Sequence, residues 1–231
     1  MVYGASLRGR LATIIAAVVA VAIVTLIFII FPRLAHAAFE RGEFGRAEVY
    51  YRIVRFFVAA PESRGAIDVS LAGCRLARAD WQGALTDLSD VEPEALGPAA
   101  RAAWYNNRAY ALARGGAAPS EALAAIDEAV RLRPDVAGFR HTRGVALLAL
   151  GRTDEAIAEL DAVWQELAGE GAPSLLEAER CFDLGTAWAK KGEKDYAKDY
   201  FLRAVQIAPR SNWGARAQAA LGLGAGQSSR P

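Results

Sequence analysis

The chain has 231 residues, 53% of them hydrophobic and 23% charged, and a formal net charge of +1. This near balance of charge gives no reason to expect a nucleic acid or a strongly acidic partner. The two cysteines, Cys74 and Cys181, belong to no C-x-x-C or cysteine–histidine pair. We therefore expect two free thiols and no metal site.

The first predicted element is the apolar run Leu11–Phe31, which contains no charged residue. As a helix it would reach ~30 Å, about the thickness of the hydrocarbon core of a bilayer. Arg8 and Arg10 lie just before it. We therefore expect a short basic head (residues 1–10) and a single transmembrane helix (residues 11–31).

A cleaved secretory signal is the alternative interpretation of this run. Arg8 and Arg10 would be its basic region, and Ala35-His36-Ala37 resembles a cleavage site. However, the run is longer than the ~7–15 apolar residues of a usual signal. Cleavage there would also remove most of a helix against which the following segment packs. We therefore favour a membrane anchor.

The orientation of the span is predicted from its positively charged flanks, which tend to stay in the cytoplasm. The two flanks carry similar numbers of arginines, but the flank after the span also contains the negatively charged Glu40 and Glu43. Translocating a short head with two arginines beside the span is disfavoured. We expect a single-pass protein of the inner (plasma) membrane with an extracytoplasmic body, which in a bacterium lies in the periplasm.

The rest of the chain has the periodicity of helices. Apolar residues recur at three- and four-residue intervals, as at Ala122, Ile126 and Ala129. Only Arg52–Val58 has a strand-like composition, and it is too short and isolated to build a sheet. Because Pro32 alone separates the span from the first of these helices, we expect one long, kinked helix that continues into the body.

The clearest motif lies between Cys181 and Pro209. It reads C-F-D-L-G-T-A-W, then Gly192, then A-K-D-Y-F, and ends at the proline. The tetratricopeptide pattern is W-x-x-L-G-x-x-Y, then A-x-x-x-F, then P, so that Cys181 and Trp188 take the two aromatic positions. The chain here resembles the tetratricopeptide-repeat (TPR) family, which implies an all-α, right-handed solenoid of stacked helical hairpins.

Weaker copies of the motif precede this one. The matching alanines are Ala47, Ala84, Ala122 and Ala156 in these copies and Ala197 in the clearest one. These alanines are separated by 37, 38, 34 and 41 residues, close to the ~34-residue period of the family. We expect about five hairpins and a closing helix, Asn212–Leu221, within residues 33–222. The glycine- and serine-rich residues 223–231 are expected to form a flexible tail.

Small residues are expected at two places in each hairpin, namely where the first helix ends and where the two helices cross. Gly42, Gly151 and Gly192 each lie five residues before a matching alanine, where the first helix should end in a left-handed glycine cap. Gly144 and Gly185 lie where two helices of a pair must cross closely. We expect large side chains of the second helix to fill the space beside them.

The sequence contains no recognisable catalytic motif. Its two histidines, His36 and His141, are isolated, and it has no G-x-S-x-G elbow, phosphate-binding glycine loop or H-E-x-x-H motif. Its carboxylates are scattered over the predicted helix surfaces. We therefore expect no enzyme, no cofactor and no small-molecule substrate.

The family resemblance implies that a partner protein or peptide binds in the concave groove lined by the first helix of each pair. The candidate groove residues are Trp104, Tyr105, Asn107, Arg108, His141, Phe182, Thr186 and Lys190. For Trp104 and Phe182, a core or stacking role is equally open. Some members of the family bind a C-terminal carboxylate with a matched set of lysine, arginine and asparagine residues on successive repeats. This set is incomplete here, because the neighbouring copies offer Val69 and Gly73. A helix or extended apolar peptide is therefore expected rather than an acidic tail.

Together these features predict a non-catalytic, membrane-anchored interaction scaffold that aids the assembly or tethering of an envelope complex. Two alternatives remain open. One is a chaperone-like holdase for unfolded or translocating clients. The other is an accessory subunit that contacts a membrane complex through its transmembrane helix.

Overall fold

The computed structural model describes most of the chain, namely residues 2–167 and 174–222, with side chains described for residues 9–163 and 175–222. All regular structure within these ranges is helical, which confirms the predicted all-α fold. The predicted tail lies outside the described residues. The chain divides into two compact units, Met1–Ala100 and Arg101–Pro231.

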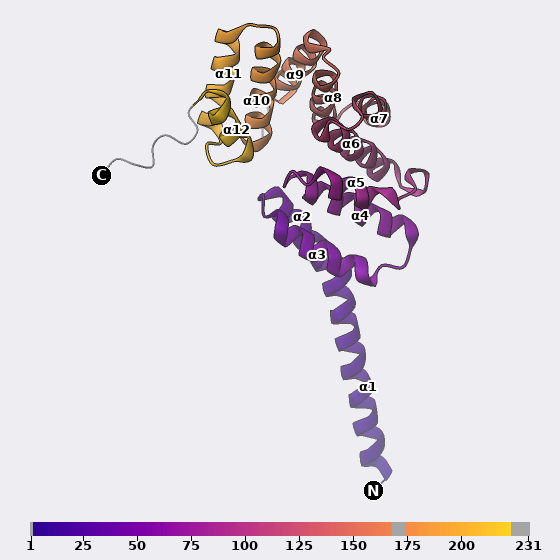
Figure 1. Ribbon diagram of the computed structural model, residues 1–231. Coiled ribbons are helices and arrows are strands. Elements are labelled where there is room, and N and C mark those ends of the chain that lie inside the picture. The colour runs from indigo at the N-terminus through magenta and orange to yellow at the C-terminus, as the bar shows by residue number, and fades with distance from the viewer. Residues whose placement is uncertain (1, 168–173, 223–231) are drawn as a thin grey trace, which may run out of the picture. The chain divides into compact units, whose positions relative to one another are not determined.

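The first unit holds the N-terminal rod and two hairpins (Figure 1). Its elements are α1 (Val2–Thr25), the π-helical turn η1 (Leu26–Ile30), α2 (Phe31–Glu40), α3 (Phe44–Phe57), α4 (Pro61–Leu76), α5 (Trp81–Ser89) and the 3₁₀ turn η2 (Pro93–Ala95). The stretch with strand-like composition is therefore helical as far as Phe57.

The second unit contains the remaining helices. These are α6 (Pro98–Gly115, which begins in the first unit), α7 (Pro119–Leu132), α8 (Ala137–Ala149), α9 (Thr153–Leu167), α10 (Ser174–Lys190), α11 (Lys194–Ile207) and α12 (Asn212–Ala220). Helices α8 and α9 pack as one pair and α10 and α11 as another, while α12 packs against both α10 and α11. Helix α12 is thus the closing helix that the sequence predicts.

Helices α1, η1 and α2 form one uninterrupted rod. The sequence predicts a kink at Pro32, and the structure places a π-helical turn immediately before this residue. The Phe31 N–H bonds to the Leu26 carbonyl, five residues earlier. Proline lacks an N–H, and its ring crowds the carbonyl four residues before it. The wider π turn relieves this crowding without ending the helix.

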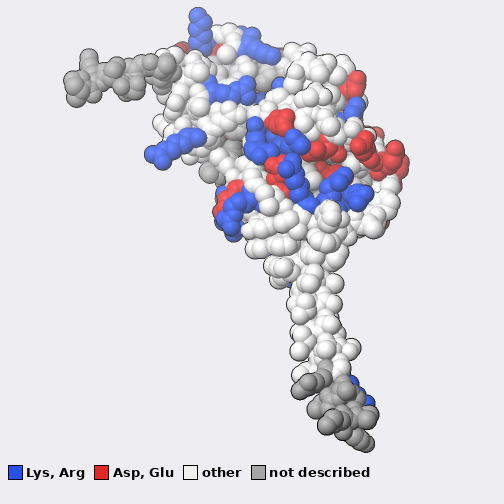
Figure 2. All heavy atoms as spheres, turned by 60° about the horizontal axis from the view of Figure 1, so that its bottom comes forward, with Lys and Arg blue, Asp and Glu red and all other residues white. Residues whose placement is uncertain are grey.

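One segment of this rod, Gly9–Glu40, is long and apolar enough to cross a membrane. Its most apolar 18-residue window has a mean hydropathy of 3.3, and only 6% of that window is buried. Such low burial excludes a core helix of this unit, whereas an N-terminal signal sequence would pass the same test of length and composition. Residues 11–32 of this segment include no charged side chain, and Figure 2 shows the middle of the rod as an uncharged stem.

Two glycines allow the close helix crossings that the repeat pattern predicts. A Cβ atom on Gly144 would lie 2.8 Å from Leu160 Cγ, and one on Gly185 would lie 2.6 Å from Phe201 Cδ1. Leu160 is fully buried and Phe201 is 8% exposed. The second helix of each pair therefore places a large side chain where the first helix has none.

The first helices of several pairs end in the same left-handed turn. Gly42, Gly151 and Gly192 have φ values of +73°, +77° and +85°. At Gly151, this N–H bonds to the Leu148 carbonyl and the next N–H bonds to the Leu147 carbonyl, as in a Schellman cap. The predicted caps are therefore present.

The turn between α4 and α5 departs from this pattern, because Ala79 occupies the left-handed position with a φ of +61°. Its N–H bonds to the Leu76 carbonyl, and the Asp80 N–H bonds to the Arg75 carbonyl. This is the same cap, built with an alanine.

Candidate partner-binding site

A hollow of about 620 Å³ lies between α10 and α12 in the second unit. Side chains of α10, α11 and α12 line it: Phe182, Thr186, Ala189, Lys190, Phe201, Arg216, Ala219 and Ala220. Three of the eight residues predicted from the sequence are among them. The hollow is open to solvent and mainly apolar, which suits a side chain of a partner better than a small polar metabolite.

Phe182 forms the floor of this hollow and is 8% exposed. Its ring centroid lies 5.7 Å from that of Phe201 and 5.5 Å from that of Trp213. The Arg216 guanidinium lies 4.7 Å from the Phe182 centroid. Phe182 is therefore a stacked core residue, and it also contributes surface to the hollow.

Two cationic side chains border the hollow, Lys190 and Arg216. Lys190 Nζ donates a hydrogen bond of 3.0 Å to the Leu148 carbonyl in the last turn of α8, where a cation complements the helix dipole. Arg216 lies over two aromatic rings, those of Phe182 and Trp213. The described residues that line the hollow include no carboxylate. Its border is therefore positively charged.

The predicted residues on α6 form a separate group that does not line this hollow. Trp104 and Tyr105 contact each other edge to face, with centroids 5.0 Å apart. The Arg108 guanidinium lies 5.8 Å from the Trp104 centroid and donates to Glu121 at 3.1 Å. Asn107 accepts a hydrogen bond from its neighbour on α6. These four side chains are half-buried.

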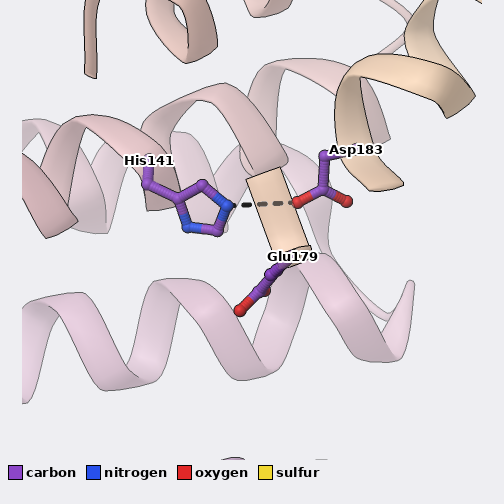
Figure 3. A group of neighbouring side chains, drawn as sticks. All are labelled: His141, Glu179 and Asp183. Carbon is purple, nitrogen blue, oxygen red and sulfur yellow. Dashed lines mark hydrogen bonds and ion pairs between the residues drawn. The ribbon is translucent and has the colours of Figure 1, made fainter. Parts of the chain in front are cut away.

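His141 does not offer its side chain to a partner, because it is only 2% exposed. Its Nε2 lies 3.2 Å from Asp183 Oδ2 on α10. Figure 3 shows the two side chains pointing toward each other, with Glu179 beside them. His141 is therefore a residue of the interior between α8 and α10, and its predicted place on an accessible groove surface is wrong.

Arg114 of α6 is the cation at the centre of this buried cluster. Its guanidinium donates two hydrogen bonds of 2.7 Å to Asp183 and one to Glu179 at 2.5 Å. The Tyr110 hydroxyl also donates to Glu179. Burial alone would raise the pKa of Asp183, but the Arg114 charge and the hydrogen bonds from His141 and Arg114 lower it to about 2.

The cluster also has the composition of a metal site, because ligand atoms of His141, Glu179 and Asp183 lie within 4.8 Å of one another. However, Arg114 already donates to both carboxylates. A metal ion would have to displace this guanidinium from a buried position. The arrangement therefore fits an internal ion pair between α6, α8 and α10, and it does not fit a metal centre.

The buried cluster supports the floor of the hollow. The Arg114 guanidinium lies 4.4 Å from the centroid of Trp213, and Trp213 packs against Phe182. Residues of α6, α8, α10 and α12 thus form one continuous set of contacts. Arg114 is therefore connected to the floor of the hollow through the Trp213 ring.

The sequence did not indicate Phe201 and Arg216 as lining residues, or Arg114 and Asp183 as their support. Phe201 was identified only as the large side chain of a repeat. Glu179 and Asp183 lie four residues apart, and hence on one helix face, which was the available signal. Their partner Arg114 is 69 residues from Asp183, so nothing local in the sequence indicates the pair.

Neither a protein-family model nor a curated protein matches this chain. Among solved structures, it is similar to a thermophilic TPR protein of Thermus thermophilus, with 24% identity and a TM-score of 0.56. This match covers 82% of the present chain and 96% of that one.

A second similar structure is a variant of the putative kinesin light chain of Podosopora anserina, which has nearly identical TPR-like repeats. The identity is 19% and the TM-score is 0.51, and the match covers 78% of this chain and 93% of that one. Both structures share the stacked helical pairs described above. The chain therefore has the tetratricopeptide-repeat fold.

Proposed function

We propose that this chain is a non-catalytic, membrane-anchored scaffold that binds a partner protein or peptide on its TPR fold. The observation that carries the proposal is the hollow between α10 and α12, which joins an aromatic floor to a cationic border. Stacked helical hairpins present such surfaces without any chemistry of their own. The scaffold would aid the assembly or tethering of an envelope complex.

The lining of the hollow suggests the chemistry of the partner. An apolar side chain would cover the rings of Phe182 and Phe201, and a neighbouring carboxylate would lie near Lys190 or Arg216. A helix or an extended segment could supply this pair of groups. Aromatic and arginine side chains in partly enclosed positions commonly provide most of the binding energy at such contacts.

The N-terminal rod supports the membrane part of the proposal. Its apolar segment is exposed along most of its length, which is favourable in a bilayer and unfavourable in water. We propose a single pass through the inner membrane over residues 11–31, with the TPR body on the extracytoplasmic side. The body would then bind its partner close to the membrane surface.

Site-specific photocrosslinking in living cells tests the binding surface. A photoreactive amino acid would replace Thr186, which lines the hollow and is half-buried. The matched control would carry the same residue in place of Lys198, an exposed position on α11 outside the hollow. We expect one dominant crosslinked protein at Thr186, identified by mass spectrometry, and none at Lys198.

Other crosslinking results would contradict the proposal in distinguishable ways. Many unrelated clients at Thr186 would indicate a holdase. If crosslinks form only from residues of the rod, the chain would be an accessory subunit that acts through its span. The same dominant product at both positions would show that the hollow is not the binding surface.

A further inference from the structure

The outer face of α3 carries an exposed apolar stripe. Val49, Ile53, Phe56 and Phe57 recur at helical spacing and, with Arg52, line a shallow hollow of about 350 Å³. Phe56 is 80% exposed, Val49 54% and Phe57 49%. An exposed patch with two large aromatic rings is unusual on a surface that faces only water, and it indicates a contact surface.

The apolar character continues through the turn that follows α3. Residues 56–61 read F-F-V-A-A-P, and all except the half-buried Val58 are exposed. Turns that face water are normally built from glycine, asparagine, aspartate and serine. The tip between α3 and α4 therefore has the composition of a surface that leaves water.

The contacts of α3 place this tip beside the apolar rod. Helix α3 runs back along α2, and the rings of Tyr50 and Phe31 stack with centroids 5.7 Å apart. Phe57 lies seven residues beyond Tyr50, which corresponds to about 10 Å of helix. Accordingly, η1 contacts α3, and Ile27 of η1 is only 7% exposed. Figure 1 shows the C-terminal end of α3 beside the junction of α1 and α2.

This position has a direct consequence if the rod spans a bilayer. Phe31 is the last residue of the predicted span, so the final turn of α3 lies beside residues within that span. The TPR body would therefore begin below the membrane surface rather than above it. Its first hairpin would extend into the boundary between lipid headgroups and hydrocarbon.

We infer that the tip formed by residues 56–61, together with the α3 stripe, inserts into this lipid boundary as a second membrane contact. The inference rests on the proposed membrane anchoring. Aromatic rings are favoured at this depth, and the charge of Arg52, which lines the same shallow hollow, is paired with Glu48 at 2.6 Å. We assign the bilayer as the partner that covers this surface, because the stripe and the tip are continuous with the apolar surface of the span.

Spin labelling of the full chain in lipid nanodiscs tests the inference. Nitroxides would be attached to Phe57→Cys at the tip, Val19→Cys in the middle of the span, and Gly45→Cys at the other end of α3. A side chain at Gly45 meets no atom within 4 Å, so this variant is a matched control on the same helix. Both native cysteines are fully buried, and burial raises the pKa of Cys74 to about 11 and that of Cys181 to about 12. Labelling of the unsubstituted chain measures their background.

The measurement is the ratio of collision rates with oxygen, which enters lipid, and with a water-soluble nickel complex. We expect this ratio at Phe57→Cys to exceed that at Gly45→Cys several-fold and to approach that at Val19→Cys. Equal ratios at Phe57→Cys and Gly45→Cys, with Val19→Cys in lipid, would overturn this inference alone. A water-exposed Val19→Cys would overturn the membrane anchoring as well. Strong dipolar coupling between Phe57→Cys labels would instead assign the stripe to contact with a second copy.

Discussion

At the scale of single residues, the second unit depends on a buried ion pair between distant helices. Asp183 is 1% exposed and accepts hydrogen bonds from Arg114 while lying beside His141. Removing one partner of such a pair leaves the other charged and poorly solvated. Asp183 therefore contributes to the stability of the fold through its ion pair with Arg114 and its contact with His141.

The first prediction concerns Asp183→Asn, which we expect to destabilise the fold by about 3–5 kcal/mol at pH 7. The lowered pKa means that the charge of Asp183 stabilises the fold above its ordinary pKa of 3.8. This contribution is lost as the pH falls toward 2. The difference in the free energy of unfolding between the variant and the parent should therefore shrink between pH 4 and pH 2. Urea-unfolding curves recorded in detergent micelles measure this difference.

Asp154→Asn is the control for this prediction. Asp154 pairs with Lys191 at 2.6 Å, but its side chain is 82% exposed. Asp154→Asn should therefore destabilise the fold by about 0.5 kcal/mol or less. If Asp183→Asn costs no more than this control at pH 7, the buried pair does not have the stabilising role described here.

The second prediction tests the helix crossing at Gly185. A leucine there would meet the Phe201 ring, and the resulting overpacking should destabilise the fold by about 1–3 kcal/mol. Gly138→Leu makes the same chemical change in α8, where an added Cβ has no neighbour within 4 Å. We expect Gly138→Leu to leave the melting temperature unchanged or raise it slightly. Equal melting temperatures for the two variants would show that the helix register is wrong.

Residue-level features were predictable from the sequence where they recur with the repeat. Gly185 and Gly144 could be identified because each copy of the motif needs a small residue at one crossing. The burial of His141 could not, because it depends on Asp183, 42 residues away. Phe182 was open to two interpretations, and the structure shows it stacked against Phe201 while part of its surface lines the hollow.

At the scale of secondary-structure elements, the left-handed caps show how strongly the repeat determines local conformation. Gly42, Gly151 and Gly192 take positive φ values, and Ala79 takes the same conformation without being glycine. The sequence predicted the three glycine caps. It carried no sign that the α4–α5 turn keeps the geometry despite the cost of a Cβ atom there.

The third prediction follows from this mismatch. Ala79→Gly should stabilise the fold by up to about 1 kcal/mol, because glycine adopts a positive φ without a steric penalty. The reverse change at an equivalent position, Gly151→Ala, should destabilise it by about 1 kcal/mol. Midpoints of urea unfolding measure both changes. Shifts of the same sign in the two variants would contradict a shared cap geometry.

The rod is the second feature at this scale. Its continuity across Pro32 could be predicted, because the apolar run and the first helix of the body abut. The π turn at residues 26–30 could not, since it depends on how the hydrogen bonds rearrange around the missing N–H. Burial of Ile27 against α3 was likewise hidden, because the sequence does not indicate how far α3 reaches back along the rod.

At the scale of the whole molecule, a TPR fold follows a proposed membrane span. The fold could be recognised from the sequence because its period and its small residues repeat several times. The hollow between α10 and α12 could be found only in part, since it needs Phe201 and Arg216 from two other helices. Membrane insertion depends on the bilayer as well as on the chain, so the sequence alone does not determine it.

The fourth prediction concerns orientation. An alkaline phosphatase fused after Pro231 should be active in a bacterial host, because this enzyme folds correctly only after export. A green fluorescent protein fused at the same position should stay dark after export through the Sec pathway. The opposite pair of results would place the TPR body in the cytoplasm.

Membrane anchoring requires that the span is retained in the mature protein, and one measurement decides this. Membranes would be washed at alkaline pH, and the tryptic peptides of the chain would be identified by mass spectrometry. We expect the chain to stay in the membrane pellet with the peptide Leu34–Arg41 intact, because this peptide crosses the signal-like sequence at residues 35–37. A soluble chain that begins at Ala38 would show that the rod is a removable signal, and it would contradict the account.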